Sequence, residues 1–265
     1  MYIKKSKSSI GILNGEIEET KPPEYHSSML IPTSQCQSQC QRFRKFSYFC
    51  PVFIFKPDMI TKIVLTGGPC AGKTTTNERI EETFTKLGYA VYTLPEAATL
   101  FIKAGAEFLT KDRNLYFEIH KSMMRFLLQM EDSFYQIAKA SGKPAIIIND
   151  RGAMDISAYM EKGDWQRLLA EVGKTEEELM ARYKAVFHLC TSAKGAQDSY
   201  TLSNNSARIE SIEEAVCVDD NLMRVWKSHP NLHIIQSEKF VKDKIDNVLS
   251  GIARELGLPE QVALD

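Results

Sequence analysis

Residues 67–74 read GGPCAGKT, a glycine-rich segment that ends in a lysine and a hydroxyl-bearing residue. This order fits the pattern G-x-x-x-x-G-K-[ST], in which glycines let the backbone curl around a phosphate and point its N–H groups inward. In such a loop Lys73 reaches the β- and γ-phosphates, and the Thr74 hydroxyl holds Mg²⁺. We therefore expect a Mg²⁺-dependent site for a nucleoside triphosphate, either ATP or GTP. The residues expected to line it are Gly67, Gly68, Pro69, Cys70, Ala71, Gly72, Lys73, Thr74 and Thr75.

The segments on either side of this loop are those that a phosphate site needs. Residues 60–66 alternate and are rich in β-branched side chains, which predicts a strand. Ile80, Phe84 and Leu87 recur at helical spacing, and Gly88 follows as a stop signal. A chance match in a glycine-rich turn is the alternative, and the flanking strand and helix count against it.

Composition excludes several other classes of protein. The chain has 265 residues, 43% of them hydrophobic, which is enough for one large domain or two small ones. The net charge of −1 gives no overall field to attract nucleic acid or an anionic membrane. No apolar run is long enough for a transmembrane helix. The six cysteines are scattered, and a disulfide at Cys70 would block the loop, so we expect a reducing, cytoplasmic location.

Residues 1–58 differ from the rest of the chain because they are rich in proline and serine and show little periodicity. Cys36 and Cys40 have no second Cys/His pair at ligand spacing, so we interpret them as unpaired thiols. The aromatic residues at 43–55 are expected to contact a membrane surface or a partner, or to add a strand to the domain. Alternatively, Met59 is the natural start. We predict a disordered or loosely packed extension at 1–58 and one domain at 59–265.

From residue 59 onward, expected strands and helices alternate, which predicts a three-layer α/β/α sandwich around a five-stranded parallel sheet. A helix is expected at 97–108. A longer one follows, with an apolar stripe of core residues at 115, 119, 123, 126, 130, 134 and 137. His120 falls outside that stripe and is expected to be solvated. The expected strands are 60–66, 89–94, 145–149, 185–190 and 232–236.

Several short motifs, in order, resemble the NadR/TRPL-translocation-defect type of AAA domain over residues 60–259. This resemblance implies a kinase-like P-loop NTPase, related to nicotinamide riboside kinase domains and more distantly to deoxynucleoside kinases. Eukaryotic relatives are associated with GTP and phosphoinositide binding and usually continue into a C-terminal β-rich domain, which this sequence does not contain. The motifs are LTGGPCAGKTT at 65–75, LPEAA at 94–98, NDRG at 149–152 with Asp155 and Ala158-Tyr159, YTL at 200–202, ARIES at 207–211 and LGLP at 256–259.

Four further residues are candidates for chemistry. Asp150 follows a buried strand and is expected to hold the Mg²⁺ water shell or act as a base; alternatively it pairs with Arg151. Glu96 resembles the base that accepts a proton from the attacking hydroxyl in related kinases, although a plain helix N-terminal glutamate would look the same. Arg151 is expected to contact a substrate or product phosphate. Arg208 is expected to reach the transferring phosphoryl group or to be a surface residue.

Three functions remain open at this point. The first is a kinase for a small hydroxyl-bearing molecule such as a nucleoside, with residues 191–208 forming a lid. The second is a regulatory GTP- or ATP-binding protein with slow turnover that works through protein or phosphoinositide partners. The third is a scaffold without chemistry, which the intact Lys73, Thr74 and Asp150 count against.

Overall fold

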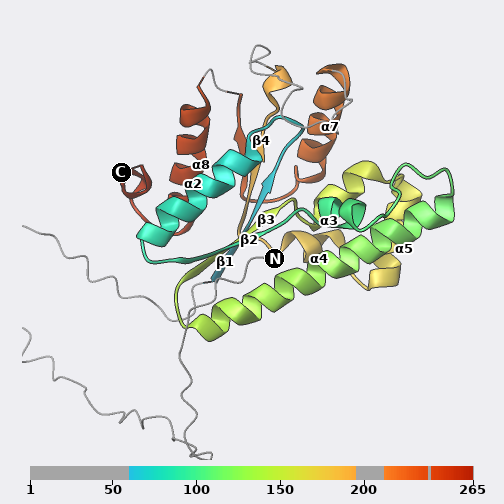
Figure 1. The fold of residues 1–265 in the computed structure, drawn as a ribbon, viewed down its shortest axis with the longest axis horizontal. Coiled ribbons are helices and arrows are strands. Elements are labelled where there is room, and N and C mark those ends of the chain that lie inside the picture. Colours follow the sequence, from blue (N-terminus) through green and yellow to red (C-terminus); the bar gives the residue numbers. More distant parts are fainter. Residues whose placement is uncertain (1–59, 195–211, 238–239, 265) are drawn as a thin grey trace, which may run out of the picture. The chain divides into compact units, whose positions relative to one another are not determined.

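The computed structural model describes residues 60–194, 212–237 and 240–264, so the extension expected at 1–58 lies outside the described residues. Five parallel strands form one sheet in the order β2-β3-β1-β4-β5 (Figure 1). The three-layer α/β/α fold predicted from the sequence is therefore confirmed. The strands are β1 (Ile60–Thr66), β2 (Ala90–Leu94), β3 (Ala145–Asp150), β4 (Ala185–Leu189) and β5 (Leu232–Ile235).

The central strands are buried on both faces, as their sequences require. In β3 the residues Ala145–Ile148 have no exposed surface, and β4 is buried along its whole length. Continuous apolar runs of this kind are typical of parallel strands covered by helices on both sides.

One face of the sheet is covered by α2 (Lys73–Lys86) and α8 (Val241–Glu255), which lie beside one another (Figure 1). The apolar side chains of these helices form one core cluster with residues of β1 and β4. The fully buried members include Ile63, Leu65, Ile80, Phe84, Phe187, Val248 and Ile252.

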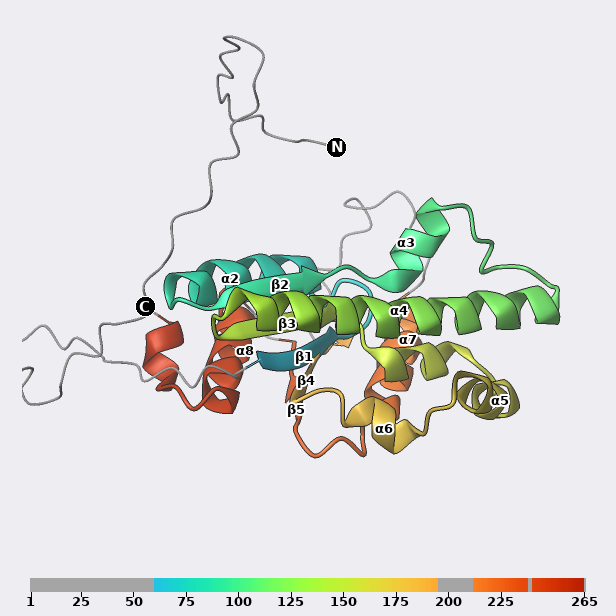
Figure 2. The ribbon, with the colours of Figure 1, turned by 90° about the horizontal axis from the view of Figure 1, so that it is seen from below.

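The opposite face is covered mainly by α4 (Arg113–Ser141), a 29-residue helix that runs alongside β3 and extends beyond the sheet to α5 (Figure 2). Its N-terminus is capped by Asp112, and Gly142 ends it in the left-handed conformation with a φ of 65°. Although α4 is long, no described helix combines the length and the apolarity needed to cross a bilayer. The remaining elements are α3 (Ala97–Lys103), α5 (Lys162–Val172), α6 (Glu176–Met180), α7 (Ile212–Val225), and the 3₁₀ helices η2 (Ala153–Tyr159), η3 (Ser192–Lys194) and η6 (Glu260–Ala263).

Two sequence expectations about this face are wrong. The helix expected at 97–108 ends at Lys103, because the chain turns at Gly105, which has a φ of 97°. The apolar stripe predicted for α4 is only partly in the core, since Leu115, Phe126 and Ile137 are all exposed. The buried face of α4 lies to one side of the predicted stripe and contains polar residues. Its members are Phe117, Ile119, His120, Met123, Met124, Leu127, Glu131 and Ala138.

Candidate functional site

The glycine-rich loop connects β1 to α2 at the carboxyl edge of the sheet. Gly67, Cys70 and Gly72 all have positive φ, at 142°, 57° and 87°. A Cβ atom on Gly67 would lie 2.1 Å from the Leu189 carbonyl oxygen, so only glycine fits there. Because Gly72 is the N-cap of α2, the loop leads directly into the positive end of a helix dipole. This arrangement suits a bound phosphate.

The buried carboxylate of Asp219, on α7, fixes the position of the phosphate loop. Its Oδ1 accepts hydrogen bonds from Gly68 N at 2.8 Å and Thr191 N at 3.2 Å. Its Oδ2 lies 2.7 Å from Lys194 Nζ, and His188 Nε2 is 3.3 Å from Oδ1. Burial raises the pKa of Asp219, but hydrogen bonds and charges from His188, Lys194 and the Gly68 N–H outweigh it and hold the pKa at about 2. Asp219 is therefore an ionised anchor of the loop.

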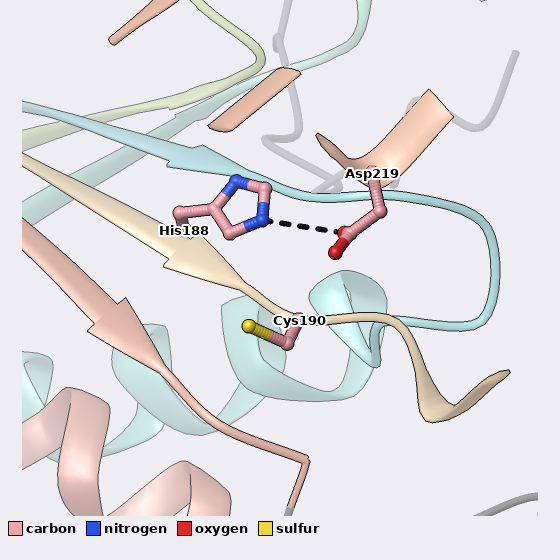
Figure 3. Close-up of side chains that lie close together, drawn as sticks. All are labelled: His188, Cys190 and Asp219. Atoms are coloured by element: carbon pink, nitrogen blue, oxygen red, sulfur yellow. Dashed lines mark ion pairs between the residues drawn. The ribbon is translucent and has the colours of Figure 1, made fainter. Parts of the chain in front are cut away.

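His188, Cys190 and Asp219 are of the right types for a metal site, and their ligand atoms lie within 4.8 Å of one another (Figure 3). However, the Lys194 ammonium group already neutralises Asp219, and a metal would have to displace it. In Figure 3 the sulfur of Cys190 also points away from the carboxylate of Asp219. We therefore interpret the cluster as support for the loop.

Lys73, Thr74 and Thr75 begin α2 at the mouth of the loop. Lys73 Nζ donates a hydrogen bond to the Gly67 carbonyl oxygen at 3.4 Å, so its ammonium group lies over the loop. Burial and the positive charge of Arg151 lower the pKa of Lys73, while Asp150 and Glu96 oppose that change. Lys73 therefore interacts electrostatically with Glu96, Asp150 and Arg151, the candidate residues at the carboxyl ends of the neighbouring strands. Thr74 and Thr75 are exposed.

Asp150 is the last residue of β3 and is paired in register with Leu65 of β1, immediately before the loop. Its Oδ1 atom is buried and has no hydrogen-bond partner among the described residues. Burial raises the pKa of Asp150, and Lys73 acts in the opposite direction. An unsatisfied carboxylate oxygen beside a phosphate loop is the ligand that a Mg²⁺ ion or its water shell needs, so Asp150 fits such an ion. The role of the Thr74 hydroxyl at that ion stays a prediction.

Glu96 and Arg151 form an ion pair across the same edge of the sheet. Arg151 Nε lies 2.6 Å from Glu96 Oε1, and Thr99 Oγ1 donates to Glu96 Oε2 at 2.6 Å. Burial raises the pKa of Glu96, but Arg151, Thr99 and Lys73 together hold it below its usual range. Arg151 Nη1 is buried without a hydrogen-bond partner among the described residues, so this guanidinium keeps a donor for a ligand.

The turn that carries Arg151 is held by a second buried carboxylate. Arg151 has a φ of 67°, which is uncommon for a residue with a side chain. Asp155 fixes this turn by accepting from Gly152 N at 2.7 Å, Thr66 Oγ1 at 2.7 Å and Trp226 Nε1 at 2.9 Å. Strained residues held by surrounding contacts concentrate at functional sites.

A cavity of about 520 Å³ opens beside Glu96 and Arg151, between α3, α4 and η2. This volume lies in the range of small-molecule sites. Its wall is mostly apolar and aromatic, and His120 is part of it at 2% exposure, so the expectation of a solvated His120 is wrong. The other lining residues are Ala97, Ala98, Ile102, Phe108, Leu109, Tyr116, Met123, Leu127, Gly152, Asp155, Ile156 and Tyr159.

The structure thus gathers the loop residues, Glu96, Asp150 and Arg151 at one edge of the sheet. Arg208 and most of the polar segment 191–208 lie outside the described residues. Sequence reasoning missed Asp219 and the role of Asp155. For Asp219 a signal was present, because it lies on the buried face of α7 with Ala215 and Leu222, and a carboxylate on an apolar face needs partners.

Comparison with known families agrees with this geometry. The family described as AAA domain matches residues 62–243. The chain belongs to this AAA-domain family. No curated protein sequence matches it.

Two solved NadR structures share the fold of this chain at low sequence identity. A NadR protein in complex with NR has a TM-score of 0.52 at 14% identity, over 76% of this chain and 53% of that one. NadR in complex with NAD and AMP-PNP has a TM-score of 0.51 at 14% identity, over 76% of this chain and 51% of that one. The chain thus spans about half the length of these NadR chains. Deoxyadenosine kinase from M. mycoides with bound dATP has a TM-score of 0.49 at 17% identity, over 72% of this chain and 99% of that one.

Proposed function

We propose that this domain binds a nucleoside triphosphate with Mg²⁺ at residues 67–75 and transfers its terminal phosphoryl group to a hydroxyl of a small acceptor. The observation that carries this proposal is the position of the cavity. It opens at the Glu96–Arg151 pair, and both residues interact electrostatically with Lys73 of the phosphate loop. An acceptor in the cavity would therefore present a hydroxyl to the phosphate bound at the loop. The NadR structures, one with AMP-PNP and one with NR, support the same class of reaction.

In this proposal Glu96 is the general base. It is ionised at neutral pH, as a base must be, because Arg151, Thr99 and Lys73 lower its pKa. Each of its oxygens accepts one hydrogen bond and has a lone pair left for the acceptor hydroxyl. The hydroxyl proton moves to Glu96 while the hydroxyl oxygen attacks the terminal phosphorus and the bond to the bridging oxygen breaks.

The cationic side chains stabilise the charge on the phosphoryl oxygens. Lys73 holds the triphosphate, and the unpaired Nη1 of Arg151 donates to the transferring group or to the product phosphate. Thr74 and Asp150 would hold Mg²⁺, which neutralises charge on the phosphates when bound. Arg208 belongs to the same proposal as a further cation over the phosphoryl group.

The decisive experiment is phosphoryl transfer from radiolabelled ATP or GTP to a panel of nucleosides, including nicotinamide riboside. Acceptor-dependent transfer that is lost in Glu96→Gln, with triphosphate affinity retained, is the expected result. Glu107→Gln, an acidic residue in the neighbouring loop outside the cavity wall, is the matched control and should transfer at the wild-type rate.

The competing function is a regulatory GTP- or ATP-binding protein. Tight triphosphate binding with no transfer to any acceptor would favour it over the kinase. Its partners would then be sought among proteins and phosphoinositide vesicles. If the wild type binds ATP and GTP no better than Lys73→Ala does, and both affinities are negligible, both functions are excluded.

A further inference from the structure

His120 forms part of the cavity wall between two aromatic rings. Its imidazole lies against Tyr116 with a centroid distance of 4.2 Å and meets Phe108 edge-on at 5.4 Å. All three residues line the cavity described above. A buried histidine of this kind is usually structural, so its hydrogen bonds decide whether it offers anything to a ligand.

The contacts of His120 fix which ring nitrogen carries the proton. Nδ1 lies 2.8 Å from the carbonyl oxygen of Tyr116, one helical turn earlier. A carbonyl oxygen can only accept, so Nδ1 carries the hydrogen and donates it. Burial lowers the pKa of His120 despite that hydrogen bond, which keeps the ring neutral at physiological pH. Nε2 therefore has a lone pair, and it has no hydrogen-bond partner among the described residues.

Two other polar side chains of the wall, Tyr116 and Asp155, are engaged within the protein, while Glu96 and Arg151 are assigned above to the acceptor hydroxyl and the phosphate. Tyr116 donates its hydroxyl to the Tyr159 carbonyl oxygen at 2.5 Å. Both oxygens of Asp155 accept from the protein, and Glu96 is paired with Arg151. Solvent reaches this open acceptor through the cavity, since it is not among the buried atoms without a partner. A ligand that displaces this water loses a hydrogen bond unless it supplies a donor of its own.

We infer that His120 Nε2 determines acceptor specificity: the cavity favours a ring compound that carries an N–H donor, such as an exocyclic amine, over one with a carbonyl oxygen at that place. This inference rests on the proposed function, since it concerns the acceptor of the same reaction. A carbonyl would bring its lone pairs against that of Nε2, while an amine would form a hydrogen bond. One such hydrogen bond in a closed site is expected to change kcat/KM about tenfold.

Matched nucleosides test this directly in the full chain. Adenosine is compared with inosine and with purine riboside, which lacks the amino group, and cytidine is compared with uridine. The wild type should prefer the amino compound in at least one series by about tenfold in kcat/KM. His120→Phe keeps a ring against Tyr116 and Phe108 but has no acceptor, and should bring the ratio close to one. Met124→Leu, a volume-conserving change at a buried residue of α4 outside the cavity wall, should leave the ratio unchanged.

The failure of this inference is distinguishable from failure of the kinase proposal. If nucleosides are phosphorylated but His120→Phe keeps the wild-type ratio, the role of His120 is refuted and the kinase stands. If none is phosphorylated, the same ratios are measured as binding affinities by calorimetry. A preference for amines that His120→Phe removes still supports the inference, whereas equal affinities or no binding by the wild type overturn it.

Discussion

Asp219 gives the sharpest test of how the phosphate loop is held. Its carboxylate is fully buried and ionised, and it joins the backbone of Gly68 to Lys194 and His188. Replacing it with asparagine keeps the shape of the side chain and removes the charge. The amide oxygen can still accept from Gly68 N, but the NH₂ group then takes the place of Oδ2 and faces the Lys194 ammonium group.

The magnitude follows from the pKa. A pKa lowered from 3.8 to about 2 means that the folded state favours the ionised carboxylate by about 2.5 kcal/mol, at about 1.4 kcal/mol for each pH unit. Because the folded-state pKa is the lower one, this stabilisation is present above pH 4 and is lost as the pH falls toward 2. By pH 3 about 1 kcal/mol of it should be gone.

Urea unfolding of the wild type and Asp219→Asn, followed by the fluorescence of the buried Trp165 and Trp226, measures this contribution. We expect Asp219→Asn to lower the free energy of unfolding by at least about 2 kcal/mol at pH 7, and the difference from wild type to shrink by about 1 kcal/mol at pH 3. Asp220→Asn is the matched control. It removes another carboxylate charge that pairs with Lys194, but at an exposed position, and should lower the free energy of unfolding by less than about 1 kcal/mol.

Two results would refute the role assigned to Asp219. One is a stability difference that stays constant between pH 7 and pH 3, which would show that its charge does not stabilise the fold. The other is unchanged ATP and GTP affinity in folded Asp219→Asn, which would show that the loop keeps its shape without the anchor.

Four further outcomes are expected. Lys73→Ala should lower triphosphate affinity at least tenfold without changing the melting temperature, whereas Lys86→Ala, at the exposed end of α2, should change neither. Glu96→Gln should retain triphosphate affinity in filter binding and lose about a hundredfold in transfer rate; Asp150→Asn should weaken Mg²⁺-dependent binding and turnover together. A chain that begins at Met59 should bind nucleotide like the full chain, and a large drop in its melting temperature would show that residues 1–58 contribute to the core.

The fold was predictable because its signals are local. Each of the five expected strands is present, with ends that differ from the expectation by at most one residue. Strand alternation, apolar runs and the glycine loop all depend on neighbouring residues, and parallel topology follows from the alternation with helices. The start of α6 is local in the same way, because Thr175 and Glu178 lie at capping-box spacing and form that box.

The buried face of α4 was not predictable, because its polar members depend on distant partners. Glu131 is fully buried, and its carboxylate is paired with two residues that come just before β4 in the chain. Arg182 Nε lies 2.7 Å from it, and the Tyr183 hydroxyl donates to it at 2.5 Å. His120 is buried beside Phe108, a residue from the segment before α4 whose ring it meets edge-on at 5.4 Å. Apolar periodicity does not identify buried polar residues, so it predicted a neighbouring stripe of α4 whose first and last residues are exposed.

The site has two halves, and each is built from a glycine and a buried carboxylate that accepts its N–H. Gly68 donates to Asp219, and a Cβ atom on it would lie 2.9 Å from the Cβ of that aspartate. Gly152 donates to Asp155, and a Cβ atom on it would lie 2.7 Å from Val64 Cγ2. At Gly68 the obstacle to a side chain is the aspartate itself, and at Gly152 it is the packed side chains of Val64 and Trp226, so in both places only glycine fits.

The helix α7 connects these two halves. It carries Asp219, which holds the phosphate loop, and it leads into Trp226, whose Nε1 donates to Asp155 at 2.9 Å. The loop and the turn that bears Arg151 are therefore fixed to one rigid element, although they belong to different strands. In the proposed reaction this matters because transfer requires donor and acceptor atoms within about 3–3.5 Å, and a displacement of about 1 Å costs about a hundredfold in rate. Trp226→Phe removes this hydrogen bond together with part of the packing of a fully buried ring. In the folded variant the transfer rate should accordingly fall more than the triphosphate affinity, and equal loss of the two would show that α7 serves the phosphate loop alone.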